Sequence, residues 1–362
     1  MRLCVDATPL LLRSAGVKTY IHSWVEALRR ATPAPAISLF PFFSGTGPLD
    51  HEKSMAPGLP TFRGLALLHA MNYLHLPALD WAAGRWDVFH SSHQLQNPPR
   101  SIPLTTTIHD MTCWLMPELH RARNVEFSRR FGESVMPRAA GLIAVSESTR
   151  RDAIRILRLD PERVVTIHSG VDARFFNPVP AIRARPYFLF VGTIEPRKNI
   201  GTLLDAWLAL PAGIREEYEL VVAGPKGWGE EQVMARLAAG IPGIQRLGYV
   251  SEEDLPSLTA GATAFVYPSL YEGFGLPVAQ ALAAGVPVIT SGVSSLPEVA
   301  GEAALFVDPH SAAELRCAIE RIALSPSLRA DLAMKARARA GLFRWEECAR
   351  KSLAFLEYVA GK

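Results

Sequence analysis

The chain has 362 residues, of which 49% are hydrophobic and 20% are charged, and its formal net charge is +3. This length allows two domains of ordinary size, and this composition excludes a disordered chain. The small net charge gives no reason to expect a nucleic-acid partner.

The N-terminus and the cysteines bear on where the protein acts. Met1–Ala7 leads straight into an apolar strand without a signal segment, and no run of about 18 apolar residues occurs. The cysteines, Cys4, Cys113, Cys317 and Cys348, lack metal-ligand spacing, so we expect buried free thiols. We therefore expect a soluble cytoplasmic protein, with peripheral contact with the inner face of the membrane as an option.

Strands and helices alternate through the first half of the chain. The predicted strands are Arg2–Asp6, Ile37–Phe43, Val88–His90, Leu104–Ile108, Gly141–Val145 and Val164–His168. A helix is predicted over Val17–Ala31 and a proline-bearing loop over Pro48–Thr61. Phe62–Trp86 is predicted as a helix packed on the sheet, although its aromatic and basic residues also suit an acceptor groove or a membrane-facing edge. This alternation is typical of a doubly wound parallel sheet.

Polar loops follow several of these strands, at the edge where parallel sheets bind ligands. Gly16 lies near a predicted helix start, where its amide can meet a phosphate, or where it simply begins the helix. His109 and Asp110 follow the strand ending at Ile108. A histidine there can bond a substrate hydroxyl, and the structural alternative is that His109 bonds a backbone carbonyl while Asp110 caps a turn. Ser146 is predicted to cap the helix after it.

A second alternation begins after a proline-rich stretch, which predicts a linker near Val171–Arg185. The predicted strands are Tyr187–Val191, Glu219–Ala223, Ile244–Leu247, Ala262–Tyr267, Pro287–Thr290 and Leu305–Val307. Helices are predicted near Ala312–Leu324 and Leu328–Leu342. A last helix, Trp345–Val359, falls outside this repeating pattern.

The loop after Tyr187–Val191 reads GTIEPRKN from Gly192 to Asn199. Arg197 offers a planar fork and Lys198 a mobile point charge, and both suit phosphate oxygens. The pair therefore predicts an anion site, although two surface cations that keep the chain soluble are the alternative.

The loop after Ala262–Tyr267 reads EGFGLPVAQA and leads into a helix. Gly275 permits a tight turn, and Pro277 suits the first helical turn because its missing N–H would be unpaired there. The free N–H groups of Leu276 and Val278 are then predicted to point at an anion above the helix end. An ordinary strand–loop–helix unit is the alternative, since short glycine motifs are weak signals.

Three strings, TIHDMTCWLMPELH, GTIEPRKN and EGFGLPVAQA, resemble the signatures of retaining glycosyltransferases of family 4. These are GT-B-fold enzymes that transfer sugars from nucleotide-sugar donors. The resemblance covers nearly the whole chain and is weakest in Gly45–Leu79. It implies two Rossmann-like domains facing across a cleft: residues 1–172 bind the acceptor, and 173–343 bind the donor. Residues 344–362 form a helix that crosses back to the first domain.

The resemblance also implies roles for individual residues. His109, Asp110 and Glu272 are implied to be catalytic, with Glu272 orienting sugar hydroxyls and His109 near the reacting end of the sugar. Arg197 and Lys198 are implied to neutralise the departing diphosphate. The other implied donor-binding residues are Gly16, Gly192, Tyr249, Phe274, Gly275, Leu276, Pro277 and Gln280.

The chain departs from the family pattern at two positions. The family motif E-x7-E places a carboxylate where this chain has Gln280, which puts the ribose contact in doubt. Many members carry an arginine where this chain has Thr193, so one phosphate contact is either missing or supplied by Arg197.

The resemblance implies transfer of a hexose, with mannose and GDP-mannose favoured, to a glycan or lipid-linked acceptor in surface-polysaccharide assembly. No cofactor and no essential metal are expected, because no Asp-x-Asp motif occurs on a plausible strand end. Two alternatives stay open: a GT-B nucleotide-sugar epimerase, and a non-catalytic sugar-nucleotide-binding scaffold suggested by Gln280 and Thr193.

Overall fold

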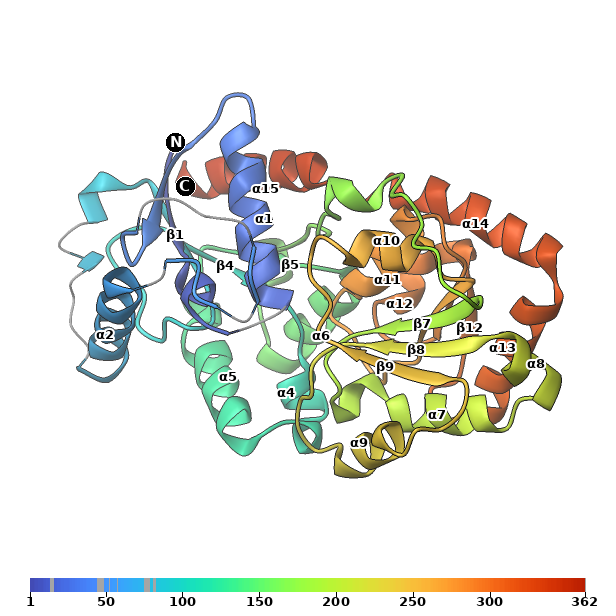
Figure 1. Cartoon of the computed structure of the whole chain (residues 1–362). Coiled ribbons are helices and arrows are strands. Elements are labelled where there is room, and N and C mark those ends of the chain that lie inside the picture. Colours follow the sequence, from blue (N-terminus) through green and yellow to red (C-terminus); the bar gives the residue numbers. More distant parts are fainter. Residues whose placement is uncertain are drawn as a thin grey trace. The chain divides into compact units, whose positions relative to one another are not determined.

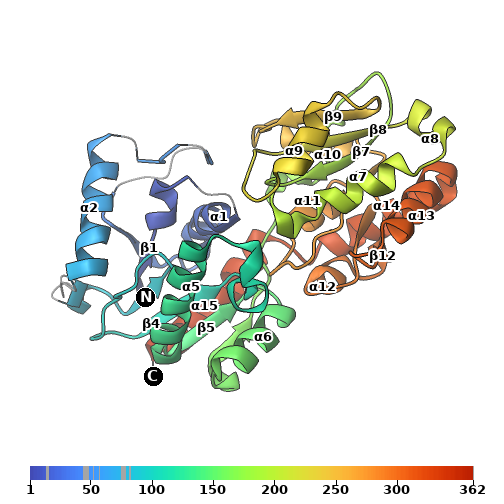
Figure 2. The ribbon, with the colours of Figure 1, turned by 90° about the horizontal axis from the view of Figure 1, so that it is seen from below.

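The computed structural model describes residues 1–13, 16–43, 49–51, 53–56, 58–74, 79–80 and 83–361. Contacts divide the chain into two compact units (Figures 1 and 2). Unit 1 comprises residues 1–170 together with 345–362, and unit 2 comprises residues 171–344. Each unit contains one parallel six-stranded sheet, so the predicted doubly wound architecture is confirmed.

In unit 1 the strands are β1 (Arg2–Asp6), β2 (Ala36–Phe40), β3 (Val88–Ser91), β4 (Leu104–Ile108), β5 (Gly141–Ala144) and β6 (Val164–Thr166). Its helices include α1 (Gly16–Arg30), α2 (Leu59–Leu74), α4 (Thr112–Leu115), α5 (Ala122–Ser134), α6 (Glu147–Leu157) and α15 (Trp345–Ala360). The strand order is β2-β1-β3-β4-β5-β6, so the order reverses between β1 and β3. The predicted cap is confirmed, since Ser146 Oγ accepts a hydrogen bond from Thr149 N at 3.0 Å.

The helix predicted within Phe62–Trp86 is confirmed over Phe62–Leu74, whereas the loop predicted for Pro48–Thr61 is wrong from Leu59 onward. Helix α2 begins at Leu59, inside the predicted loop, because Pro60 lies in the first turn, where its missing N–H costs no hydrogen bond. The helix ends at Leu74, short of Trp86, and part of the remaining stretch lies outside the described residues.

Helix α15 returns to unit 1 and packs on α1, as predicted. The buried indole of Trp24 on α1 donates a hydrogen bond to Ser352 Oγ on α15, at 2.9 Å. The rings of Tyr20 and Trp345 lie edge to face with centroids 5.8 Å apart. The terminal helix therefore completes the covering layer of the first sheet.

In unit 2 the strands are β7 (Tyr187–Val191), β8 (Glu219–Ala223), β9 (Ile244–Gly248), β10 (Ala264–Tyr267), β11 (Val288–Ser291) and β12 (Ala304–Val307). Its helices are α7 (Ile200–Leu208), α8 (Ala212–Glu217), α9 (Glu231–Ala238), α10 (Leu255–Ala260), α11 (Leu276–Ala283), α12 (Leu296–Ala300), α13 (Ala312–Leu324) and α14 (Pro326–Ala340). Helix α7 packs with α13, and α11 packs with α14.

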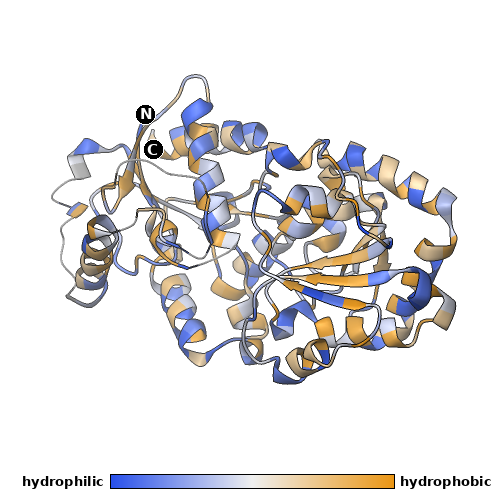
Figure 3. Cartoon of the chain, viewed as in Figure 1, coloured by the Kyte–Doolittle hydropathy of each residue, from blue (hydrophilic) through white to orange (hydrophobic). Residues whose placement is uncertain are grey.

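The strand order of unit 2 is β12-β11-β10-β7-β8-β9. Strands β7 and β8 are strongly apolar, as Figure 3 shows, because both of their faces are covered by helices. The order reverses between β7 and β10, and ligands of open α/β sheets bind at such a reversal. The loops that leave β7 and β10 are therefore the expected location of a site.

Two further observations concern the whole set of described residues. None of the helices described is long and apolar enough to cross a membrane. Cys4, Cys113 and Cys348 are buried free thiols as predicted, but Cys317 is exposed, so the prediction of burial is wrong there. Cys317 lies on the surface helix α13, where its side chain faces away from the core.

Candidate active site

Two loops meet at the reversal point of unit 2. The first, after β7, contains a short 3-10 helix, Pro196–Lys198, and the second follows β10. Leu270 N donates to Arg197 O at 2.9 Å, and Asn199 Nδ2 donates to Pro268 O at 3.0 Å. These bonds bring the predicted cations next to the predicted carboxylate, although Lys198 and Glu272 are 74 residues apart in the chain.

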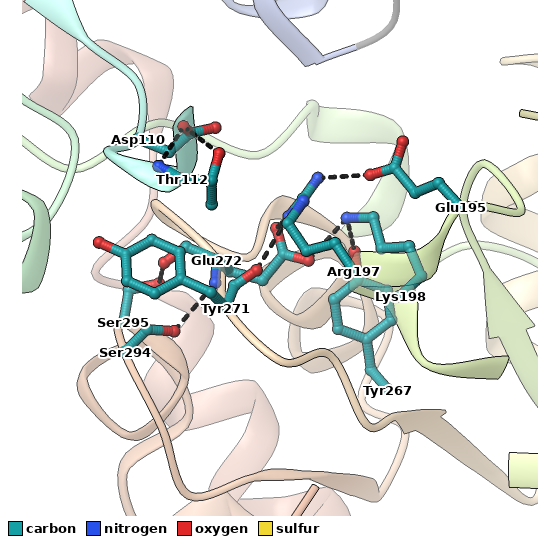
Figure 4. A network of polar contacts seen from close by, with 10 residues as sticks. All are labelled: Asp110, Thr112, Glu195, Arg197, Lys198, Tyr267, Tyr271, Glu272, Ser294 and Ser295. Atoms are coloured by element: carbon teal, nitrogen blue, oxygen red, sulfur yellow. Dashed lines mark hydrogen bonds and ion pairs between the residues drawn. The ribbon is translucent and has the colours of Figure 1, made fainter. Parts of the chain in front are cut away.

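A cluster of four charged side chains results, three of them buried and Arg197 half-buried, and Figure 4 shows Arg197 between two carboxylates. Arg197 Nη1 lies 2.7 Å from Glu272 Oε2, and Arg197 Nη2 lies 2.8 Å from Glu195 Oε1. Lys198 Nζ donates to Glu272 Oε1 and to the hydroxyl of Tyr267, each at 2.6 Å. We call Glu195, Arg197, Lys198 and Glu272 the charged cluster.

The charged cluster perturbs the ionisation of its own members and of the neighbouring Tyr267. Burial alone would raise the pKa of Glu272, but the charges of Arg197 and Lys198 outweigh it and lower that pKa to about 2. Burial, and then the neighbouring charge of Arg197, lowers the pKa of Lys198. Burial and the nearby Glu272 carboxylate raise the pKa of Tyr267 well above its ordinary value. Glu272 is therefore an anion throughout the neutral range.

Two serines hold the peptide of Glu272 from the loop after β11. Glu272 N donates to Ser294 Oγ, and Ser295 Oγ donates to Glu272 O, each at 2.9 Å. The sequence interpretation missed Ser294, Ser295, Glu195 and Tyr267. The two serines could have been found from the sequence, because they lie in the loop that follows β11, the strand next to β10.

The start of helix α11 differs from its prediction. Gly275 adopts φ +89°, and a Cβ there would lie 2.9 Å from Leu296 Cδ2, so only glycine fits without strain. Val278 N donates to Gly275 O at 2.9 Å. The prediction of a free N–H at Val278 is therefore wrong, because the first turn closes tightly on the carbonyl of its own cap. Leu276 N and Pro277 occupy the first turn as predicted.

The remaining predicted residues of unit 2 surround these two loops or adjoin neighbouring strand ends. Gly192 follows β7, and Gly224, which follows β8, approaches it so closely that a Cβ at Gly224 would lie 1.9 Å from Gly192 O. The ring of Phe274 is buried and lies edge to face with Phe343, at 5.5 Å. Tyr249 follows β9 and is 43% exposed, whereas Gln280 on α11 is partly buried.

The other three predicted residues belong to unit 1. His109 is partly buried against the edge of Tyr20, with centroids 4.8 Å apart, and burial lowers its pKa to about 3. Asp110 Oδ1 accepts hydrogen bonds from Thr112 N at 3.0 Å and from Thr112 Oγ1 at 2.6 Å. This is the turn-capping role named as the structural alternative. Gly16 begins α1 with open space around it.

Neighbouring buried polar groups fix this end of the first sheet. His90 on β3 bonds Thr105 Oγ1 at 3.0 Å and Thr107 Oγ1 at 3.1 Å. Asp6 at the end of β1 accepts bonds from Thr8 and from Ser92, which follows β3. These bonds tie the two strands that flank the reversal point of unit 1.

No group of three or more His, Cys, Asp or Glu side chains that could hold a metal ion occurs among the residues described. The charged cluster instead offers two cations whose partners are carboxylates. Such an arrangement can bind an oxyanion by exchanging a carboxylate for phosphate oxygens.

Comparison with known proteins identifies the family to which the chain belongs. A family model described as Glycosyltransferase Family 4 matches residues 14–175, and one described as Glycosyl transferases group 1 matches residues 173–339. O-antigen chain mannosyltransferase B of Escherichia coli is 31% identical, over 98% of this chain and 98% of the relative. The chain belongs to glycosyltransferase family 4. The family predicted from its motifs is confirmed, and the chain is a glycosyltransferase.

Solved structures agree on the fold of this family 4 protein. Sucrose-phosphate synthase from Thermosynechococcus elongatus aligns over 100% of both chains, with a TM-score of 0.73 and 19% identity. HepE of Anabaena, in complex with UDP, aligns over 99% of this chain and 100% of that chain, with a TM-score of 0.71 and 17% identity. These likenesses concern the fold alone, and they confirm the predicted GT-B class.

Proposed function

We propose that this glycosyltransferase transfers mannose from GDP-mannose, with retention of configuration, to a glycan or lipid-linked acceptor in surface-polysaccharide assembly. The charged cluster carries the proposal, because it places two cations and a carboxylate at the reversal point of unit 2. The name of the O-antigen chain mannosyltransferase supports mannose and a glycan acceptor. HepE, solved with UDP and with UDP-glucose, supports a nucleotide-sugar donor. We further propose that transfer occurs in the cytoplasm, at the inner face of the membrane.

The chemistry proposed for unit 2 is electrostatic. Negative charge accumulates on the diphosphate as its bond to the sugar breaks, and fixed cations stabilise that charge without reorganising. Arg197 and Lys198 would supply this stabilisation, which is why we propose a reaction that needs no divalent metal. Glu272, ionised at neutral pH, would accept hydrogen bonds from sugar hydroxyls. Gln280 would contact the ribose through an uncharged amide.

The lowered pKa of His109 gives unit 1 a proposed role. A histidine that is neutral at pH 7 can donate one hydrogen bond and accept another without repelling a developing positive charge on the sugar. We propose that His109 contacts the transferred sugar and that Asp110 shapes the loop through Thr112.

The test is a transfer assay with GDP-mannose and a mannose-terminated oligosaccharide, run in EDTA, with the product anomer assigned by NMR. We expect an α-linked product, no loss of rate with EDTA, and loss of transfer in Glu272→Gln. The matched control is Asp205→Asn, which removes a carboxylate from a surface ion pair with Arg236, 2.7 Å apart. A β-linked product or a rate that requires added metal would contradict the proposal. Nucleotide binding without transfer to any acceptor would favour the scaffold alternative.

A further inference from the structure

The charged cluster carries no net charge in the absence of a ligand. Arg197 and Lys198 contribute two positive charges, and Glu195 and Glu272 contribute two negative ones. The side chains are only 7–14% exposed, so the ion pairs are screened little by solvent. Both cations proposed to bind the diphosphate are thus already neutralised by carboxylates of the same unit.

The two carboxylates are held very differently. Glu272 contacts both Arg197 and Lys198, and its peptide is fixed on both sides by serine hydroxyls. Among the described residues, the Glu195 side chain makes one polar contact, the 2.8 Å pair with Arg197 Nη2. Glu195 is therefore the partner that Arg197 can release at the smaller cost.

A carboxylate and a phosphate bind an arginine fork in the same way, through paired N–H donors and two oxygens. Glu195 Oε1 thus occupies the N–H donor at Arg197 Nη2 to which a diphosphate oxygen would otherwise bond. The backbone keeps this carboxylate close even after displacement, because Lys198 N donates to Glu195 O at 3.0 Å. A displaced Glu195 remains a like charge beside the bound diphosphate.

We propose that Glu195 competes with the diphosphate for Arg197 and thereby limits how tightly this site holds a nucleoside diphosphate. The inference rests on the proposed donor site. Such competition lowers the affinity of the site for the nucleoside diphosphate product as well as for the sugar donor. Release of the product is then not slowed by two cations that lack a competing carboxylate. Glu195 is thus an affinity-setting residue, whereas Glu272 stays in place.

The test is calorimetric titration of GDP and UDP into the wild type, Glu195→Gln and Glu195→Ala, with GMP and UMP as probes that lack the second phosphate. We expect Glu195→Gln to lower the dissociation constant of the preferred diphosphate about tenfold, since a like charge a few ångströms away is removed. Glu195→Ala should tighten binding further, because it also frees Arg197 Nη2. The monophosphates should change much less, and so should Asp205→Asn as matched control.

The outcomes separate the inference from the proposed function. If the wild type binds a diphosphate and both Glu195 variants, with unchanged thermal unfolding, bind it equally or more weakly, Glu195 only positions Arg197 and the inference is wrong. Equal tightening for mono- and diphosphates would also overturn it, since the effect would then be general electrostatics. If the wild type binds neither GDP nor UDP, the proposed donor site itself fails, and the inference fails with it.

Discussion

Replacing Glu272 by glutamine tests the electrostatics of the charged cluster through protein stability. The cations beside Glu272 lower its pKa to about 2 from an ordinary value of 4.5. A carboxyl group with a lowered pKa stabilises the folded state above its unfolded pKa, and this contribution is lost as the pH falls through the folded value. The difference between the two pKa values corresponds to a stabilisation of the folded state by about 3 kcal/mol at pH 7 and by about half of that at pH 3.

Glutamine cannot ionise, so the variant lacks this pH-dependent term. We expect Glu272→Gln to be less stable than the wild type by about 3 kcal/mol at pH 7, with the gap roughly halved at pH 3. Urea unfolding at both pH values, monitored by circular dichroism and by tryptophan fluorescence, measures the difference in the free energy of unfolding between the wild type and the variant. Asp205→Asn, from the exposed pair with Arg236, should change stability by less than about 1 kcal/mol. An equal gap at pH 7 and pH 3 would refute the linkage reasoning.

Three further predictions concern other parts of the structure. Lys198→Ala should reduce sugar transfer by about 100-fold or more while the circular dichroism spectrum is kept, and full activity would contradict its role. Gly275→Ala should cost about 1–3 kcal/mol because of its positive φ, whereas Gly16→Ala, in open space at a helix start, should be neutral or stabilising by urea unfolding. Ser352→Ala should cost about 1–3 kcal/mol by leaving the buried Trp24 N–H unpaired, and an unchanged thermal midpoint would contradict the contact.

Most of the strands were predictable because they are short runs that are buried on both faces of the sheet, although the edge strand β9, Ile244–Gly248, is partly polar and exposed. Their ends were less predictable. The predicted strand Ile37–Phe43 stops at Phe40, since Pro41 has no N–H to give to a neighbouring strand. The same residue type misled the interpretation at Pro60, where a proline begins a helix instead of marking a loop. Local residue type alone does not distinguish these two uses of proline.

The positions of the cations and the carboxylate near strand ends were also predictable, because Arg197, Lys198 and Glu272 lie in the loops that follow apolar strands. Their mutual pairing was not, since chain order does not show that β7 and β10 are neighbours. Glu195 was missed for a different reason: it lies two residues from Arg197 in the same loop, and residue type alone does not show that the two side chains pair. Its partner Arg197 looked like a cation available to phosphate until the structure showed both of its carboxylate contacts.

The most direct measurement is a calorimetric panel of GDP, UDP, ADP and dTDP against the wild type and Lys198→Ala, in buffer containing EDTA. A donor site built on the charged cluster predicts that the wild type binds one of these nucleotides, GDP by preference. It also predicts that chelation leaves this binding unchanged and that Lys198→Ala loses it. Binding by none of the four, or binding that Lys198→Ala retains in full, would contradict a donor site at the charged cluster.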